Sequence, residues 1–488
     1  MTVSDTGSGP RREAAASGRC GSDAVVVGGG LAGTTAALAL ADAGVRVTLV
    51  ESRPRLGGLA FSFRRDSAAG ELSVDNGQHV YLRCCTAYQW FLKRVEGLEL
   101  APVQERLDVP VLDVGGTRGA RLGRLRRAAL PVPLHLAASL ARYPHLSLAE
   151  RASVGRAALA LRGLDLADPA LDDQDFGSWL RGHGQSPRTI EALWDLVGIA
   201  TLNATADDSS LALAAMVFKT GLLSEPGAAD IGWARVPLGE LHDTLARTAL
   251  DKAGVRVITQ GKVTSVHRLP GGDHQVSVDS GFKLSERESE TMAVDTVVLA
   301  VPQREAHRLL PAGALDEPGR LLEIGTAPIL NLHVIYDRKV LRRPFFAALG
   351  SPVQWVFDRT ESSGLTGGGQ YLAISQSIAH DEISEPVGRL RARYLPELER
   401  LLPAARGAGV RDFFVTRERT ATFAPTPGTG RLRPAARTNT PGLYLAGAWT
   451  ATGWPATMES AVRSGLAAAD TALTGLGRSH DNPLQEAA

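Results

Sequence analysis

Three titratable side chains stand where they could move a proton: Asp75 and His79 in the stretch DNGQHV (75–80), and Glu459 near the C-terminus. An imidazole titrates near neutrality, so His79 is the leading candidate for a general acid or proton relay, with Asp75 and Glu459 as alternative acids. Each also has a structural interpretation. Asp75 would cap a turn, Glu459 would cap or pair at the final helix, and His79 would bond to backbone.

A glycine-rich turn near the N-terminus could hold a phosphate-bearing cofactor. Residues 24–27 (AVVV) predict a strand, GGGLAG (28–33) follows at once, and a helix is expected to run to about Ala43. The glycines permit a tight turn, close approach of a pyrophosphate to the backbone, and close packing of helix on strand. The helix N-terminus then faces the phosphates. The expected binding residues are Gly28, Gly30, Leu31, Ala32 and Gly33.

A second predicted strand, VRVTLVE, ends in Glu51. This glutamate lies about 20 residues beyond the glycine turn, where an acid accepts hydrogen bonds from an adenosine ribose. Glycines alone are weak evidence, because they also end helices in proteins that bind no nucleotide. The order strand, turn, helix, strand and acid is what predicts a dinucleotide site.

The residues after Glu51 distinguish FAD from NAD. The run ESRPRLGG (51–58) resembles the E-x-x-x-R-x-G-G extension of flavin amine oxidases, polyene desaturases and their relatives. The resemblance implies FAD as cofactor, with Ser52 and Arg53 along the adenosine half and the Gly57-Gly58 backbone beside the pyrophosphate. Leu59 stands where this superfamily usually has an arginine, which leaves one phosphate contact open.

The C-terminal region predicts a strand over 442–446, a glycine-rich turn, and a helix opening at Pro455. A helix N-terminus carries free N–H groups and partial positive charge, which stabilise the negative charge of a reduced flavin. The residues expected to contact the flavin are Gly447, Ala448, Pro455, Thr457 and Met458. Many superfamily members have Asp or Glu at the position of Ala448, so contacts to the ribityl chain are open.

A narrower resemblance rests on DNGQHV, Leu202-Asn203, 417–423, Pro427-Gly428, Arg433-Pro434 and 445–465, and it extends from residue 24 to about 475. Together these segments resemble the hydroxysqualene dehydroxylases. The resemblance implies FAD-dependent conversion of hydroxysqualene to squalene in bacterial hopanoid and related triterpene pathways. It also implies flavin contacts from Asn76, Gly77 and Gln78, and passage of the Val263 backbone over the adenine.

The hydroxyl group to be lost in that reaction is allylic. Protonation and departure of water would create a delocalised cation, which hydride from reduced FAD can quench. Trp449, Trp454 and Trp194 could stabilise the cation through their π faces, by roughly 0.5–2 kcal/mol for each well-placed ring. Aromatic residues are also ordinary cavity wall, an interpretation that suits Trp194 best.

The predicted fold is α/β, with an FAD-binding Rossmann-like domain of the GR2 type and an interleaved α+β substrate domain. The expected FAD domain comprises 23–100, 236–310 and 431–476, the substrate domain 101–235 and 311–430, and the disordered tails 1–22 and 477–488. The first substrate segment is predicted to be helical, including a capping box at Ser147–Glu150. A hairpin-rich insertion is expected over 255–302. Three β-rich runs, at 327–336, 353–359 and 371–377, predict a sheet forming the floor of a large cavity.

A formal net charge of +1 argues against a nucleic-acid partner. Three cysteines without zinc spacing predict no metal site and reduced cytoplasmic thiols. No signal peptide or membrane span is expected. Between Arg118 and Arg162 nine arginines are opposed only by Glu150. They indicate either a peripheral contact with the inner face of a membrane, fitting a hydrophobic isoprenoid substrate, or solvated helix faces.

Two other functions remain open. A carotenoid-type polyene desaturase or an amine oxidase would use the same cofactor in the opposite redox direction. A non-catalytic prenyl-binding escort would bind lipid without redox chemistry. The DNGQHV stretch favours the dehydroxylase, and the flavin-facing C-terminus argues against the escort. The electron donor and the oligomeric state cannot be predicted from these motifs.

Overall fold

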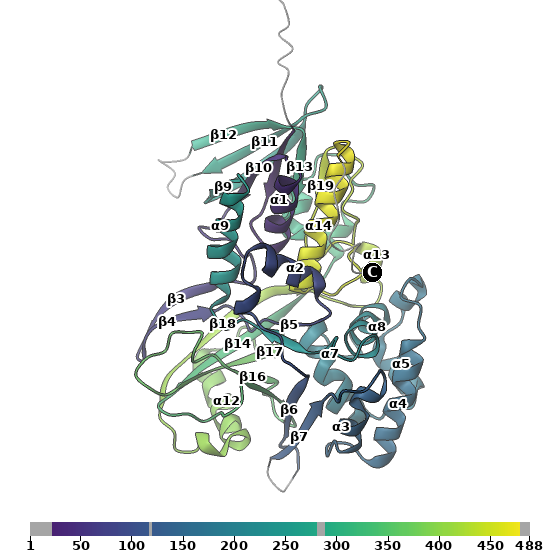
Figure 1. Cartoon of the computed structure of the whole chain (residues 1–488), viewed down its shortest axis with the longest axis vertical. Helices are drawn as coiled ribbons and strands as arrows, with labels where there is room; N and C mark the ends of the chain where they lie inside the picture. Colours follow the sequence, from purple (N-terminus) through teal and green to yellow (C-terminus); the bar gives the residue numbers. More distant parts are fainter. Residues whose placement is uncertain (1–21, 117–119, 281–287, 479–488) are drawn as a thin grey trace, which may run out of the picture.

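A computed structural model of the chain describes residues 22–116, 120–280 and 288–478. Arg118 and the expected terminal tails, apart from residues 22, 477 and 478, lie outside these ranges. Figure 1 shows two regions: a parallel sheet with its helices above, and a larger mixed sheet with a group of helices below. The chain passes between the two regions several times.

The upper region is built on a five-stranded sheet in the order β19-β13-β1-β2-β9, in which every neighbouring pair is parallel. Its strands are β1 (Asp23–Val27), β2 (Arg46–Glu51), β9 (Arg256–Thr259), β13 (Thr296–Leu299) and β19 (Leu443–Leu445). Helices cover one face and a second, antiparallel sheet covers the other, so β1 and β13 are buried almost throughout and read as continuous apolar runs. This arrangement confirms the predicted Rossmann-like sheet.

Four helices lie on one side of this sheet: α1 (Leu31–Asp42), α2 (Thr86–Arg94), α9 (Leu245–Lys252) and α14 (Met458–Gly475). Helix α14 packs along α1 (Figure 1). The predicted start of the last helix, Pro455, is wrong by three residues. Thr457 is the N-cap, and its side chain accepts a hydrogen bond from the Ser460 N–H, so the helix begins at Met458.

The expected hairpin-rich insertion is confirmed as a three-stranded antiparallel sheet beside the parallel one. Its strands are β10 (Gly261–Arg268), β11 (His274–Ser280) and β12 (Glu288–Val294). A register shift between Val263 and Ser265 bends β10 where it leaves the nucleotide sheet. Helices α10 (Gln303–Leu309) and α11 (Arg320–Glu323) follow.

The lower region contains a seven-stranded sheet in the order β18-β14-β17-β16-β15-β6-β7. Its strands are β6 (Asp108–Asp113), β7 (Arg121–Arg126), β14 (Thr326–Tyr336), β15 (Phe345–Leu349), β16 (Trp355–Asp358), β17 (Gln370–Ser377) and β18 (Val410–Phe423). The three predicted β-rich runs are confirmed as β14, β16 and β17. Helix α12 (Val387–Leu401) packs against β18.

The prediction that 101–235 is helical is wrong for its first part. Residues 108–113 and 121–126 form β6 and β7, and β6 pairs with β15, more than 200 residues later in the chain. After β7, Pro131 and Pro133 lack the N–H groups that a helix needs. Only the three-residue η2 (Leu134–Leu136) and the short α3 (Ala137–Ala141) form before the next helix, α4.

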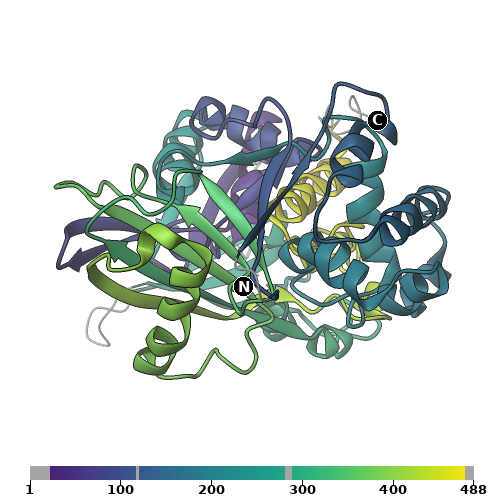
Figure 2. The ribbon, with the colours of Figure 1, turned by 90° about the horizontal axis from the view of Figure 1, so that it is seen from below.

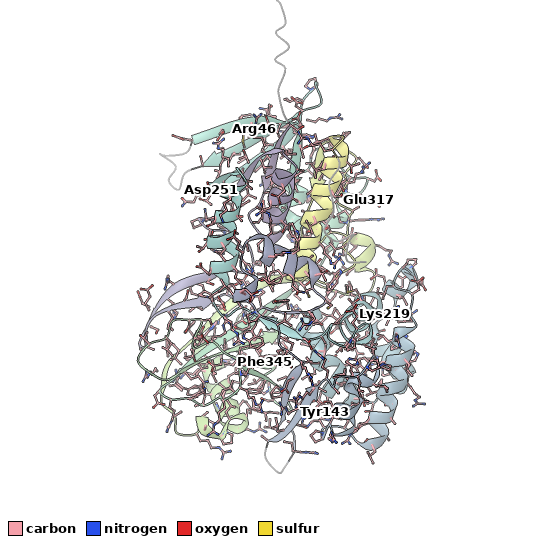
Figure 3. The ribbon with its side chains drawn as sticks, viewed as in Figure 1. Arg46, Tyr143, Lys219, Asp251, Glu317 and Phe345 are labelled. Atoms are coloured by element: carbon pink, nitrogen blue, oxygen red, sulfur yellow. The ribbon has the colours of Figure 1, made fainter. Side chains whose placement is uncertain are left out.

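Beyond residue 147 the predicted helices are present. They are α4 (Leu148–Arg162), α5 (Phe176–Gly182), α6 (Pro187–Thr189), η4 (Ile190–Trp194), α7 (Asp195–Leu202) and α8 (Leu211–Phe218). The capping box at α4 is confirmed, because Ser147 and Glu150 bond reciprocally. Figure 2 shows these helices grouped to one side of the large sheet. Phe345 and Tyr143, labelled in Figure 3, belong to the core of this region.

Two small sheets connect the regions: β3 (Ser62–Ser67) with β4 (Gly70–Asp75), and β5 (Val80–Leu82) with β8 (Ile231–Trp233). Residues 76–79 therefore form the link between β4 and β5. None of the helices in the described parts of the chain is long and apolar enough to cross a lipid bilayer.

Candidate active site

Two backbone loops meet at the carboxyl ends of β1 and β2 and form a cradle. Gly30 precedes α1, and no side chain caps that helix, so its first N–H groups point out of the turn. Gly57 and Gly58 lie opposite. A Cβ atom added at Gly58 would lie 2.9 Å from the Gly30 Cα, so the two loops approach this closely only because residue 58 is glycine. Leu31, Ala32 and Gly33 form the first helical turn. The cradle has the open backbone and the positive helix end that a pyrophosphate requires.

The Glu51 carboxylate hydrogen-bonds to both loops of this cradle. One carboxylate oxygen accepts the Gly29 N–H at 2.7 Å, and the other accepts the Arg53 N–H at 2.7 Å and the Ser52 hydroxyl at 3.2 Å. The Arg53 side chain is exposed beside it. Val263 is buried at the β10 bulge, and its carbonyl oxygen accepts from Arg308 at 3.3 Å.

Two residues outside the sequence-based candidates support the same loop. The His242 Nδ1 lies 2.8 Å from the Ala60 carbonyl oxygen, and its Nε2 lies 2.8 Å from the Tyr88 hydroxyl. The Arg55 guanidinium donates to the Gly58 carbonyl at 3.1 Å and lies 3.2 Å from the centre of the Phe61 ring. Arg55 belongs to the quoted motif, whereas no local pattern marks His242.

Burial lowers the pKa of His242 to about 4. Below about pH 6.5, the ordinary pKa of histidine, this imidazole takes up a proton in the unfolded chain but not in the folded protein. Its contribution to the free energy of unfolding is therefore complete above pH 6.5 and is lost as the pH falls toward 4. When the pH falls from about 7 to about 5, we expect the neutral, buried His242 to lower the free energy of unfolding by about 2 kcal/mol. The free energy of unfolding, measured with urea at both pH values, should differ less between them in His242→Gln than in wild type. The exposed His380→Gln should behave as wild type, and an unchanged pH dependence in His242→Gln would contradict this assignment.

The buried Arg433 side chain hydrogen-bonds to the turn after β19. Its guanidinium donates to the carbonyl oxygens of Ala448, Thr450 and Trp454 at 3.1, 2.5 and 2.9 Å. Burial lowers the pKa of Arg433 to about 10. The Gly447 N–H donates to the Ser464 hydroxyl at 2.8 Å. The turn is therefore held by bonds between its backbone and the side chains of Arg433 and Ser464, and the Ala448 methyl group takes no part in them.

The N-terminus of α14 follows this turn, with Pro455 buried just before it. No acceptor within the described residues pairs with the N–H groups of Thr457 and Met458. The Glu459 carboxylate points elsewhere. It is fully buried and accepts the Ala87 and Tyr88 N–H groups at 3.1 and 2.7 Å, at the start of α2, as well as Arg463 at 2.6 Å. The expected pairing at the final helix is thus present through Arg463, while the helix that Glu459 caps is α2.

Asp75 is likewise occupied. One oxygen accepts the Ser62 hydroxyl at 2.6 Å and the Leu238 N–H at 2.9 Å, and the other accepts Arg359 at 2.5 Å. The side chains of this ion pair are only 5% and 10% exposed. Asp75 therefore joins β4 to two distant segments, and these three bonds are structural contacts.

The Asn76 side chain bonds to the loop that carries the glycine doublet. Its amide group accepts from the Phe61 N–H at 3.0 Å and donates to the Leu59 carbonyl at 2.8 Å and to Glu418 at 3.1 Å. Two polar atoms nearby, Nε2 of Gln78 and Oδ1 of Asn331, are buried without a partner among the described residues. Orphaned groups of this kind fit a polar ligand edge.

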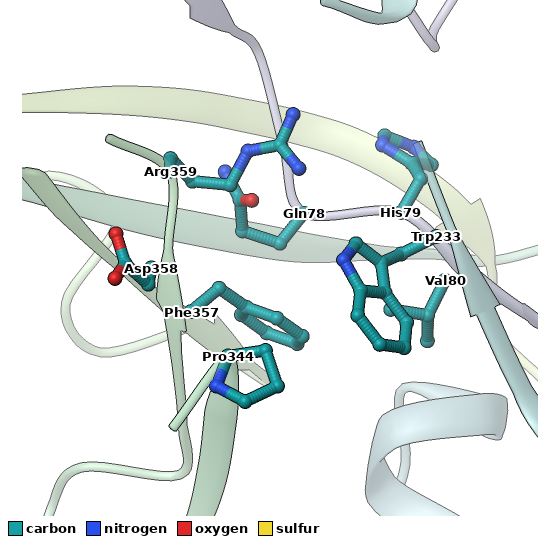
Figure 4. Close-up of a pocket in the computed structure, with 8 residues that line it drawn as sticks. All are labelled: Gln78, His79, Val80, Trp233, Pro344, Phe357, Asp358 and Arg359. Carbon is teal, nitrogen blue, oxygen red and sulfur yellow. The ribbon is translucent and has the colours of Figure 1, made fainter. Parts of the chain in front are cut away.

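His79 stands in a pocket of about 10 Å³, room for little more than one water molecule. Figure 4 shows the His79 ring and the Arg359 guanidinium on one side of it, with apolar side chains below. The lining residues are Gln78, His79, Val80, Trp233, Pro344, Phe357, Asp358 and Arg359. Pairing of Val80 with Trp233 between β5 and β8 forms one wall.

The geometry favours a neutral His79. Its Nδ1 lies 3.2 Å from the Gly77 carbonyl oxygen, which assigns the proton to Nδ1 and leaves Nε2 as the free atom. Burial, and to a smaller extent the charge of Arg359, lower the pKa of this imidazole. Once protonated, it is a stronger acid than an exposed histidine.

A second and larger cleft, of about 290 Å³, opens between η4, α7 and the connection from β15 to β16. Its lining includes Asp195, Leu196, Ile199, Val353 and Trp355. Burial raises the pKa of Asp195 to about 6. Of the three runs expected to form the floor of a large cavity, only 353–359 lines this cleft, and the volume of the cleft is small for a triterpene.

Aromatic rings connect the cleft to the His79 pocket. Trp355 lies 6.2 Å from Phe357 and 6.3 Å from Phe345, and Phe345 lies 5.5 Å from Trp233. The tryptophans expected from sequence lie elsewhere. Trp194 packs in the helical core, and the Trp449 N–H donates to the Val301 carbonyl at 3.0 Å. The Arg463 guanidinium covers the Trp454 ring at 4.8 Å.

Comparisons with known proteins agree with this geometry. Residues 31–473 match the family described as flavin containing amine oxidoreductase. The hydroxysqualene dehydroxylase of Rhodopseudomonas palustris is 30% identical over 92% of this chain and 97% of that protein, and the one of Zymomonas mobilis is 26% identical over 92% and 98%. The structure of cyclohexylamine oxidase from Brevibacterium oxydans has the same fold, with a TM-score of 0.68, 17% identity, and coverage of 94% of this chain and 100% of that one.

The cradle, the free helix ends and the orphaned amide groups fit FAD, which this family carries. The Gly30 and Gly58 loops would hold its pyrophosphate, and the α14 N-terminus would face its ring. This chain belongs to the flavin-containing amine oxidoreductases and is an FAD-dependent oxidoreductase of the hydroxysqualene dehydroxylase type.

Proposed function

We propose that the enzyme removes the hydroxyl group of hydroxysqualene and releases squalene, in bacterial hopanoid or related triterpene synthesis. The observation that supports this most directly is the His79 pocket. An imidazole with a lowered pKa stands there against an aromatic wall, in a space that admits little water. Loss of an allylic hydroxyl needs both a strong acid and a dry, electron-rich surface.

The overall step consumes two electrons and two protons: the C–O bond breaks, a C–H bond forms, and water leaves. When bound and reduced by an external donor, FAD supplies the hydride. His79 Nε2 would deliver the proton to the hydroxyl group, while the Gly77 carbonyl holds the ring in place. Trp233 and Phe357 would face the allylic carbons, where a ring can contribute roughly 0.5–2 kcal/mol to stabilising positive charge.

The test uses the full-length protein with bound FAD, reduced with dithionite under anaerobic conditions and mixed with hydroxysqualene. We expect squalene by mass spectrometry together with reoxidation of the flavin. His79→Gln should retain FAD but react about 10²–10⁴ times more slowly, the usual loss for a missing general acid. The exposed His380→Gln should match wild type.

The alternative functions give different outcomes. A desaturase or an amine oxidase would leave hydroxysqualene unchanged, and its oxidised flavin would instead be reduced by a polyene or an amine. Reducible bound FAD without squalene formation would overturn the proposal. Squalene formation at the wild-type rate by His79→Gln would overturn only the role of His79.

A further inference from the structure

We propose that one face of the lower region docks on an anionic lipid bilayer. This docking face consists of β7, residues 127–142 and the outer side of α4. The inference rests on the proposed function only in that a triterpene substrate resides in membranes. The surface itself is defined by exposed side chains that the catalytic site does not use.

Large apolar side chains gather on the docking face. It carries half of the ten that are exposed in the described residues: Leu122, Leu130, Leu134, Leu148 and Leu159. Leu148 and Leu159 are eleven positions apart, three helical turns, so they share one side of α4, and they are 79% and 58% exposed. The opposite side of α4 is buried in the core. Isolated exposed leucines are common, but a cluster of them indicates a contact surface.

Arginines without acidic partners surround these leucines. In the part of the chain that the structure describes, no carboxylate pairs with the exposed Arg121, Arg126, Arg142, Arg156 or Arg162. By contrast, Arg124 and Arg127 in the same region pair with Asp108 and Asp230. Glu150, the acid within α4, is already bonded to Ser147 and Ser186. Leucines bordered by unpaired arginines match the boundary between acyl chains and anionic head groups.

The elements of the docking face are joined into one surface. The Arg126 N–H donates to the Ser139 hydroxyl at 2.8 Å, which ties β7 to α3. The Arg151 guanidinium donates to the Ala141 carbonyl at 2.6 Å, which ties α3 to α4. Figures 1 and 2 show β7, α3 and α4 together at the end of the molecule away from the nucleotide sheet. A bilayer at this face would leave the FAD cradle in solvent.

The 290 Å³ cleft begins beside this face. Arg188 bonds to Asp113 at 2.5 Å and to Glu191 at 2.8 Å, and Glu191 lies at the edge of the cleft. Asp113 is also the register partner of Arg121 on β7. An apolar chain leaving the bilayer could therefore enter the cleft and follow the aromatic rings toward His79. The position of the cleft is a second, independent reason to assign a lipid surface to this face.

The test measures co-sedimentation of the full-length FAD-bound protein with vesicles. One set is phosphatidylcholine alone, and the other is an equal mixture of phosphatidylcholine and phosphatidylglycerol. We expect binding to the anionic set that weakens with added salt. Loss of two charges in Arg156→Gln/Arg162→Gln should weaken it about 30-fold. Leu148→Ser/Leu159→Ser should also weaken binding, through loss of inserted apolar surface.

The matched control is Leu322→Ser/Val387→Ser, which removes two exposed apolar side chains outside the docking face and should bind as wild type. Conversion of detergent-dispersed substrate should be unchanged in every variant, which separates docking from the proposed reaction. Equal binding to both vesicle sets, or equal loss in the control, would overturn the inference. A dimer that dissociates when Leu148 and Leu159 are replaced would overturn it as well, because a second copy would then cover this face.

Discussion

Alanine at Gly33 is expected to yield a colourless protein that no longer retains FAD. A Cβ atom there would lie 1.8 Å from the Gly28 carbonyl oxygen and 3.1 Å from the Ala300 Cβ. Both neighbours belong to the rigid sheet edge, so α1 must move away from β1, and its N-terminus then leaves the pyrophosphate. We expect a loss of about 3 kcal/mol or more of unfolding free energy. The ratio of flavin to protein absorbance and a urea unfolding curve measure both effects.

Gly155→Ala is the matched control, since Gly155 also lies inside a helix but has no atom within 4 Å of an added Cβ. It should retain FAD and gain about 0.5–1 kcal/mol, because alanine loses less backbone entropy than glycine. A Gly33→Ala protein with a full complement of FAD would show that α1 does not depend on this contact.

Asparagine at Asp75 is expected to destabilise the protein by about 3–5 kcal/mol, because it leaves the buried Arg359 guanidinium without a counter-charge. The residue also fixes the start of the DNGQHV link, so catalytic turnover should fall together with stability. Urea unfolding of the FAD-bound protein gives the first quantity, and anaerobic turnover gives the second. Replacing both charges, in Asp75→Asn/Arg359→Met, should restore part of the lost stability.

Glu290→Gln provides the comparison for an exposed pair. Glu290 and Arg256 are 42% and 57% exposed, and pairs of this kind contribute less than about 1 kcal/mol. If Asp75→Asn proved no more costly than Glu290→Gln, the ion pair with Arg359 would not be the support that its burial indicates.

The nucleotide end could be predicted well because its requirements are local. The strand β1, the glycine turn and α1 are consecutive in the chain, and the sterics of a pyrophosphate restrict which residues can follow each other there. The strands β6 and β7 could not be predicted in the same way. They are short, arginine and proline interrupt their pattern, and the partner that makes β6 a strand is β15, far along the chain.

The candidate site shows the same difference between residues that act locally and residues that the fold brings together. Glu51 and the two glycine loops lie where their spacing placed them. The structural interpretation of Glu459 is right in part, because it pairs with Arg463 of the final helix but caps α2. Asp75, expected to cap a turn, instead forms a buried ion pair with Arg359.

Arg359 and His242 were not found, because each acts on residues that only the fold brings near. Arg433 belongs to a segment that carries the resemblance, but its bonds to the turn at 448–454 were not predicted. Arg359 is separated from Asp75 by 284 positions. Trp233 and Phe357, the aromatic wall of the His79 pocket, were missed for the same reason, because both lie far from His79 in the sequence.

The strand order β19-β13-β1-β2-β9 also determines when a newly made chain can load its cofactor. On the ribosome β1 and β2 emerge first, yet β1 must wait for β13, and β13 for β19 near the C-terminus. At 5–20 residues per second, roughly 20–90 s pass between the first strand and the last, with apolar strand edges unpaired throughout. The five-stranded sheet, together with the cradle and the α14 N-terminus that it positions, can therefore be complete only after synthesis is nearly finished.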